Sequence, residues 1–281
     1  MNPQPVFFIA KKEFMDNFRN KWVIVLTIAF ALLAIVFSLF GSIFGSGWQD
    51  IGATVGVLTS VVTLIIPIIA IILGYSAIIG EIERGSMNAL LSLPTTRFEI
   101  VLGKLFGLGS ILASAIFIGF GIAGIIIGLN IENPDVAGYI IFIVATILYS
   151  WVFLCLALFF STLFKKRSTA MGGAIFLWIL FIMIIPTVIQ GLLFAEVGFE
   201  AVLSGEGAQI PDWYFAGRLV DPGSVYTSLL TLSIADAVDP GNFFQTPYPS
   251  YYSAALMTVL LIAWISIFFT LSYWRFSKKD I

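Results

Sequence analysis

The sequence predicts an all-α membrane protein with six transmembrane helices, and three observations support this fold class. Hydrophobic residues make up 59% of the 281 positions, and the mean hydropathy is +1.03. A bilayer solvates that much apolar surface, whereas a soluble domain of this length cannot bury it. Six uncharged stretches also reach the roughly 20 residues that a membrane-spanning helix needs. They are residues 22–44, 55–79, 105–129, 136–164, 168–194 and 254–273, so we expect one transmembrane domain over residues 1–281.

The basic residues predict the orientation of these spans. Thirteen of the fourteen lie in residues 1–21, 80–104, 165–167 and 275–281, which six spans place on one side, and only Arg218 falls on the other. Positively charged loops stay inside, so we expect a multi-pass protein of the cell membrane with both termini in the cytoplasm. The first apolar run is too long for a cleaved signal peptide.

Residues 4–20 carry the pattern of an amphipathic helix. Phe7, Ala10, Phe14 and Phe18 recur at helical spacing, and Lys12, Asp16 and Arg19 fall on the other side. This pattern favours a helix lying in the cytoplasmic membrane interface before the first span. The alternative is a basic flank that only orients that span.

The loop at residues 195–250 lies on the outer side and is long enough to indicate a function. Residues 225–238 are apolar enough for a short helix, and the aromatic run at 212–215 is typical of an anchor at the membrane interface. A cap over an exit pathway and a docking surface for an extracytoplasmic partner both remain open.

The residue inventory argues against an enzyme. The chain has no histidine, and its single cysteine, Cys155, lies within a span, where a small buried residue is the expected role. No GxxxxGK[ST] phosphate loop occurs, and none of the six spans contains Asp, Glu, Lys or Arg, the groups typical of ion-coupled carriers. We therefore expect no cofactor, metal or nucleic acid on this chain, and transport would need an external source of energy.

A charged segment at residues 80–104 separates the second and third spans. It reads GEIERGSMNALLSLPTTRFEIVLGK, and Pro94 is expected to end a short helix that begins near Met87. Leu90, Leu91 and Leu93 would then face lipid or a partner, beside the charged residues Glu81, Glu83 and Arg84. A new helix follows Arg97, with Glu99 near its start. The residues alone do not choose between a partner-binding segment and a solvated loop.

This segment resembles the signature of type 2 ABC exporter permeases, in particular their NosY-like branch. The matching positions are Gly80, Glu81, Glu83, Gly85, Ser86, Leu90, Leu91, Ser92, Pro94, Arg97, Glu99, Gly103 and Lys104. The resemblance implies a permease dimer that exports or extracts a substrate, driven by two separate ATPase subunits that bind ATP and magnesium. Residues 80–97 would form the ATPase-coupling segment, with contacts from Glu81, Glu83, Arg84, Gly85, Ser86, Asn88, Leu91, Pro94 and Arg97.

One departure limits what the resemblance implies about the substrate. The NosY-like branch is linked to maturation of a copper site, but no histidine, one cysteine and six methionines are a poor inventory for a copper path. The substrate stays open, and so does a rival function as a membrane scaffold or channel. Glycine pairs four residues apart, at 41 and 45, 52 and 56, 103 and 107, and 124 and 128, allow close helix packing within one chain or in a homodimer.

Overall fold

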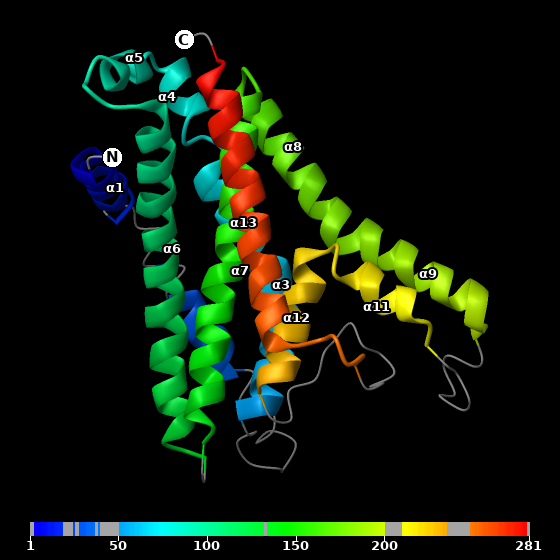
Figure 1. Cartoon of the computed structure of the whole chain (residues 1–281). Coiled ribbons are helices and arrows are strands. Elements are labelled where there is room, and N and C mark those ends of the chain that lie inside the picture. Colours follow the sequence, from blue (N-terminus) through cyan, green and yellow to red (C-terminus); the bar gives the residue numbers. More distant parts are fainter. Residues whose placement is uncertain are drawn as a thin grey trace.

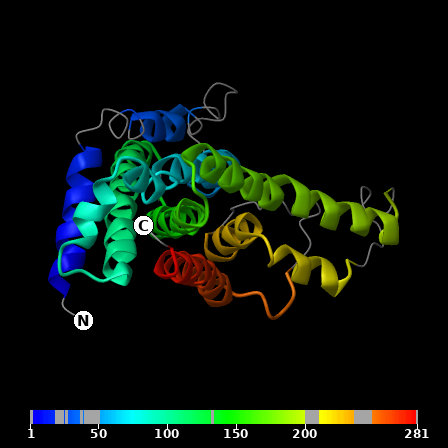
Figure 2. The same cartoon turned by 90° about the horizontal axis from the view of Figure 1, so that it is seen from above.

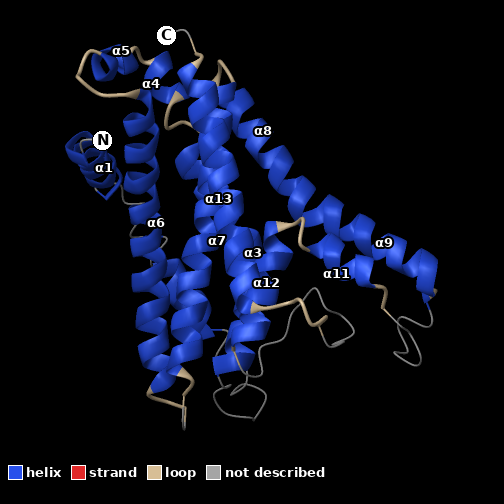
Figure 3. Cartoon of the chain, viewed as in Figure 1, coloured by secondary structure: helices blue, strands red, loops and turns tan. Residues whose placement is uncertain are grey.

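The computed structural model describes residues 3–18, 25, 28–36, 39, 51–131, 134–199, 210–234 and 248–279, and the regular elements in these ranges are helical (Figure 3). The prediction of an all-α fold is confirmed for this part of the chain. The helices are α1 (Pro3–Phe18), α3 (Ile51–Gly74), α4 (Ile79–Glu83), α5 (Ser86–Leu91), α6 (Arg97–Gly128), α7 (Val136–Leu163), α8 (Arg167–Ile179), η1 (Leu180–Ile184), α9 (Ile185–Val197), α11 (Asp212–Arg218), α12 (Pro222–Ser233) and α13 (Ala254–Ser277).

Five helical segments of the described residues are long and apolar enough to cross a membrane. They are Thr54–Glu83, Arg97–Gly128, Val136–Leu163, Arg167–Val197 and Ala254–Ser277, and they match the last five predicted stretches. The first stretch, residues 22–44, lies largely outside the described residues. Its residues 28–36 are helical, and Phe30 is buried against Phe120 of α6, with 5.2 Å between the ring centroids. A total of six spans therefore stays a prediction.

Helix α7 forms the centre of the bundle and packs against α3, α6, α12 and α13 (Figure 1). Its Tyr149 is fully buried, donates a hydrogen bond to the Thr63 carbonyl of α3 at 3.1 Å, and stacks on Tyr226 of α12 at 4.6 Å between ring centroids. Buried polar groups need such internal partners because a bilayer core offers no water. Cys155 is buried in the same helix, as expected for a small core residue.

The continuous segment α8–η1–α9 leaves the bundle as it runs from Arg167 to Val197 (Figures 1 and 2). The π-helical turn η1 immediately precedes α9, whose first turn contains Pro186. Proline lacks an N–H and its ring crowds the carbonyl four residues before it, which explains the wider turn at this position. Leu193 is the buried residue of α9, whereas Val188 and Leu192 are exposed.

Two helices form in the predicted outer loop: α12 packs against α7 and α13 of the bundle, and α11 packs against α9 (Figure 1). The expected helix at 225–238 begins earlier, because the Asp221 carboxylate caps the N–H groups of Gly223 and Ser224 and Pro222 suits the first turn. The expected interfacial anchor at 212–215 is wrong for Tyr214 and Phe215, since both side chains are buried. Their aromatic area belongs to the core.

Helix α1 lies across the long axis of α6 (Figures 1 and 2). Ile9 is buried against α6, whereas Phe7, Phe8 and Phe18 are exposed. Ile9 and Glu13 thus lie on the side that contacts α6, beside the phenylalanine face that was predicted to lie in the membrane interface. The exposed phenylalanines suit lipid contact, and the location of α1 at a membrane surface stays a prediction.

Candidate functional site

The predicted coupling segment forms two short helices, α4 and α5, at one end of the bundle (Figure 1). We call this the α4–α5 end. Helix α3 stops at Gly74, five residues before the predicted end of that stretch, and α4 follows a turn. The N–H groups of Ile78 and Ile79 both donate to the Ser161 hydroxyl of α7 at 3.0 Å. The start of α4 is thereby fixed to the central helix.

A glycine makes the sharp corner between α4 and α5. Gly85 has φ +76°, a left-handed conformation that disfavours any residue with a Cβ. The single helix predicted from about Met87 to Pro94 is accordingly α5 alone, preceded by a separate α4. After α5 the chain passes Pro94 and enters α6 through a capping box. In it the Thr96 hydroxyl accepts from the Glu99 N–H at 3.2 Å and the Glu99 carboxylate accepts from the Thr96 N–H at 2.8 Å.

The inner face of α5 packs on a small apolar cluster. Met87 is fully buried, and Leu90 and Leu91 pack partly against the same cluster. The remaining members are Ile9, Ile78, Ile100, Val101 and Phe276, from α1, the turn before α4, α6 and α13. Of the three leucines predicted to face lipid or a partner, only Leu93 is largely exposed, at 53%.

A buried lysine joins three helices below α4. Lys104 of α6 is 1% exposed, and its ammonium lies 2.6 Å from a Glu13 carboxylate oxygen of α1 and 2.9 Å from one of Glu81 of α4. Lys12 adds a longer contact to Glu81 at 3.6 Å. A buried charge is tolerated only when it is paired. Glu81 therefore serves as an internal partner of Lys104, and it is not one of the exposed charges beside the leucines.

Two glycines bring α1 close enough for this contact. A Cβ on Gly103 would lie 2.7 Å from the Ile9 Cβ, and one on Gly107 would lie 2.5 Å from the Glu13 Cβ. The glycine pair at 103 and 107 thus seats α1 within one chain. The pair at 124 and 128 lies against α7 and the residues before it, since a Cβ on Gly124 would collide with Tyr139. The pair at 41 and 45 lies outside the described residues, and a packing role of the pair at 52 and 56 stays a prediction.

Two arginines tie the segment to other helices. Arg167, at the start of α8, forms an ion pair with Glu83 at 2.7 Å, donates its backbone N–H to that carboxylate at 3.0 Å and donates a guanidinium N–H to the Gly80 carbonyl at 2.8 Å. Arg97 donates to the carbonyls of Phe276, Ser277 and Lys279 at 2.6, 3.1 and 2.7 Å. The first two carbonyls belong to the last turn of α13 and the third follows it, where regular helical hydrogen bonding ends.

The C-terminal segment also donates hydrogen bonds to the carbonyls at the end of a helix. Lys279 donates to the carbonyls of Thr162 and Phe164, at the end of α7, at 2.9 and 2.6 Å. Burial lowers the pKa of Lys279, and the nearby charges of Arg275 and Lys165 lower it further. All four basic segments of the sequence therefore meet at the α4–α5 end.

The predicted site residues thus divide into two groups. Glu81, Glu83 and Arg97 bind other parts of the chain, and Leu91 packs partly on the cluster. The exposed ones form a surface that we call the α5 face, made of Arg84, Gly85, Ser86, Asn88 and Pro94, to which Leu93 is added. The sequence reasoning missed the roles of Glu13, Ser161, Arg167 and Lys279. A lysine at the start of an otherwise apolar helix, Lys104, was the available signal for a buried partner.

Comparison with known proteins gives consistent matches. A family model for the ABC-2 family transporter protein matches residues 7–281. A protein of Stutzerimonas stutzeri described as a probable ABC transporter permease protein NosY is 32% identical over 280 residues, which cover 98% of each chain. A protein of Pseudomonas aeruginosa with the same description is 32% identical over 284 residues, covering 98% of this chain and 99% of the relative.

Proposed function

The chain belongs to the ABC-2 family of transporter proteins, as a multi-pass permease subunit of an ABC transporter, and on this premise we propose that the α5 face is its binding site for an ATPase subunit. In this proposal, separate ATPase subunits bind ATP and magnesium and drive export, or extraction of a substrate from the membrane. The observation that carries it is the structure of the α4–α5 end. The α5 face is exposed, and the neighbouring helix α4 is bound by ion pairs and hydrogen bonds to α1, α6, α7 and α8.

The internal contacts give a route by which movement of α5 would reach the spans. Displacement of α4 and α5 acts on α6 and α1 through Lys104, on α8 through the Glu83–Arg167 pair, and on α7 through Ser161. Arg97 couples the start of α6 to the end of α13. Among these contacts, the ion pairs of Lys104 are buried, and breaking a buried ion pair costs about 3–5 kcal/mol, so they favour movement of α1, α4 and α6 as a unit.

The remaining features of the proposal follow from charge and from the family. The positive charge gathered at the α4–α5 end supports a cytoplasmic location of that end and of both termini in the cell membrane. ABC permeases work with ABC ATPases, and we propose two such subunits on a permease homodimer. An extracytoplasmic partner at residues 195–250 also belongs to the proposal.

The experiment uses a double variant of the α5 face, Arg84→Glu with Leu93→Asp. Both side chains are exposed, so the fold is expected to survive. Glu83 is left intact because its reversal would break the contact with Arg167. We expect the variant to lose the copurifying ATPase and the stimulation of ATP hydrolysis.

Lys11→Glu is the matched control, because it reverses an exposed charge on α1 and is expected to retain the ATPase. Normal assembly and stimulation in the double variant would contradict the proposal. Ion conductance of the pure permease, with no ATPase bound to it, would favour the rival function as a channel.

A further inference from the structure

Basic side chains gather where the end of α13 meets the turn between α7 and α8 (Figure 1). Lys279 holds these two parts together, because its ammonium group donates to the carbonyls of Thr162 and Phe164 at 2.9 and 2.6 Å. Burial lowers the pKa of Lys279, and the charges of Arg275 and Lys165 lower it further, so these three cations lie close enough to repel one another. Crowding of like charge is unfavourable, and a bound anion would offset it.

The accessible cations at this junction form a surface that we call the α13 basic patch, made of Lys165, Lys166, Arg275 and Lys278. The three lysines are exposed and Arg275 is half-buried. In the part of the chain that the structure describes, no carboxylate forms an ion pair with any of the four. Glu83, the acid beside the turn between α7 and α8, is bound to Arg167 at 2.7 Å. The patch therefore carries positive charge that the described chain does not pair.

An apolar stripe on α13 runs into this patch. Its members are Ile267, Leu271 and Trp274, and Lys278 continues it, at spacings of four, three and four residues that place them on one side of the helix. The three apolar side chains are exposed, and the Lys278 ammonium lies 4.4 Å from the centre of the Trp274 ring. Because α13 is long and apolar enough to span a membrane, a tryptophan and a cation at its end are expected at the level of the lipid headgroups.

This order of charge and apolar surface matches an amphiphile with an anionic head. A phosphate group at the patch would contact Lys278 and the cations around Lys279, and the attached acyl chains would lie along Leu271. A free anion would use the cations and none of the stripe. A soluble acidic protein would not contact side chains along the spanning part of α13. A cluster of Lys and Arg next to a membrane span is typical of binding to anionic lipids.

We propose that the α13 basic patch binds the phosphate of an anionic phospholipid, and that the acyl chains of this lipid cover the apolar stripe that ends at Lys278. The bound lipid offsets the repulsion around Lys279 and stabilises the junction of α13 with α7. The inference is independent of the ATPase proposal, because no residue of the patch belongs to the α5 face. It requires only that α13 spans the membrane.

The test measures lipid retained by the purified full-length chain in native mass spectra, from micelles with equal phosphatidylglycerol and phosphatidylcholine. The wild type is expected to retain phosphatidylglycerol selectively. The double variant Lys165→Gln with Lys278→Gln is expected to lower that retention about tenfold or more, because two exposed cations are lost. The charge-preserving double variant Lys165→Arg with Lys278→Arg is expected to keep most of it.

Lys11→Gln with Arg84→Gln is the matched control, because it removes two exposed positive charges that lie outside the patch. This control is expected to retain phosphatidylglycerol as the wild type does. Equal retention in the control and in Lys165→Gln with Lys278→Gln would overturn the proposal.

Trp274→Gln separates a lipid from a soluble anion, because it removes apolar surface and leaves the four cations in place. A severalfold loss of phosphatidylglycerol in this variant would support the lipid site. Wild-type retention in Trp274→Gln would show that the patch recognises the phosphate alone, and it would overturn the lipid site. If Lys165→Gln with Lys278→Gln loses the copurifying ATPase and keeps phosphatidylglycerol, the patch binds the protein partner and the proposal is wrong.

Discussion

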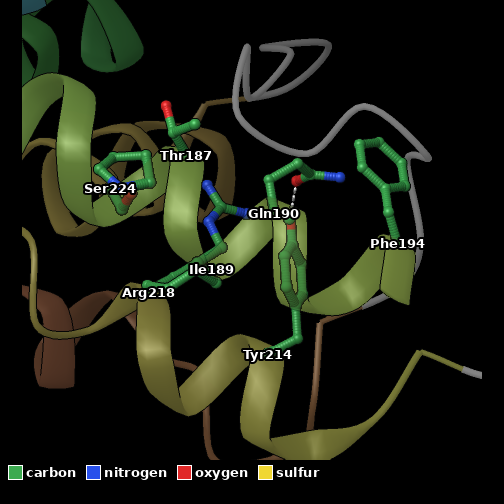
Figure 4. A pocket seen from close by; sticks show the side chains of 9 residues that line it. Thr187, Ile189, Gln190, Phe194, Tyr214, Arg218 and Ser224 are labelled. Atoms are coloured by element: carbon green, nitrogen blue, oxygen red, sulfur yellow. Dashed lines mark hydrogen bonds between the residues drawn. The ribbon is translucent and has the colours of Figure 1, made fainter. Parts of the chain in front are cut away.

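The two ends of the molecule are built differently. At the α4–α5 end, Lys104, Glu83 and Arg97 join helices distant in sequence, through ion pairs and carbonyl contacts of 2.6–3.1 Å. At the other end, α9 leaves the bundle and a pocket separates it from α11 and α12 (Figure 4). In the central helix α7, 67% of the most apolar window is buried, against 11% in α8–α9.

The contrast in burial and pairing indicates that α9 can be displaced more easily than the helices at the α4–α5 end. At the α4–α5 end, separating α1 or α4 from α6 would leave the buried Lys104 uncompensated, which opposes movement of these helices relative to one another. A helix with few buried contacts can shift at a low cost in free energy. If α5 binds the ATPase as we propose, we expect a force applied there to pass through the α4–α5 end and to displace α9 most.

The largest effect is expected from Lys104→Met, which breaks the rigid end directly. It leaves Glu13 and Glu81 without their cation, so the free energy of unfolding should fall by about 3–5 kcal/mol. Denaturant titration in mixed micelles measures it. Lys12→Met, which removes a 57% exposed partner of Glu81, should cost about 1 kcal/mol or less. Equal losses in the two variants would show that burial of Lys104 is unimportant.

A methyl group at Gly107 should detach α1 from α6. Because its Cβ would lie 2.5 Å from that of Glu13, Gly107→Ala is expected to lower stability by about 1–3 kcal/mol. Gly121→Ala is the control in the same helix, where no heavy atom lies within 4 Å, and it should be neutral or stabilising. Thermal unfolding of the two variants side by side measures the difference, and an unchanged Gly107→Ala would refute the seating of α1 by this glycine.

The smallest effect concerns the packing of α12 on α7. Tyr226→Phe keeps the ring stacked on Tyr149 but removes the hydrogen bond with Thr146, at 2.8 Å, for a loss of about 0.5–1.5 kcal/mol. Tyr251→Phe serves as the control, since the hydrogen bond of its hydroxyl to the Asp212 carbonyl is exposed and 3.5 Å long. If Tyr251→Phe lowers the free energy of unfolding as much as Tyr226→Phe does, the buried hydrogen bond between Tyr226 and Thr146 does not stabilise the packing of α12 on α7.

Local patterns predicted the spans and the break of the charged segment at Pro94, because hydropathy and proline act on neighbouring residues. The acid expected near the start of the third span, Glu99, forms a capping box. Long-range contacts were beyond such reasoning. Glu13 and Lys104 are 91 residues apart in the sequence. Arg97 is 179 and 182 residues from Phe276 and Lys279, whose carbonyls it binds. Only the packing of α1 and α13 on α6 brings these groups together.

The outer loop shows the same limit for burial. The run at 212–215 has the composition of an interfacial anchor, but α11 folds back and buries Tyr214 and Phe215. Arg218 was noted only as the basic residue on the unexpected side. Its position in a pocket follows from the divergence of α9, which no local pattern shows.

Photo-crosslinking tests the binding site of the ATPase most directly. A photoreactive residue replaces Asn88, which is exposed on the α5 face, and the control position is Lys11, which is exposed on α1. The account predicts a crosslinked product with the mass of permease plus ATPase from position 88 and none from position 11. No product from position 88, in a complex that still hydrolyses ATP, would contradict it.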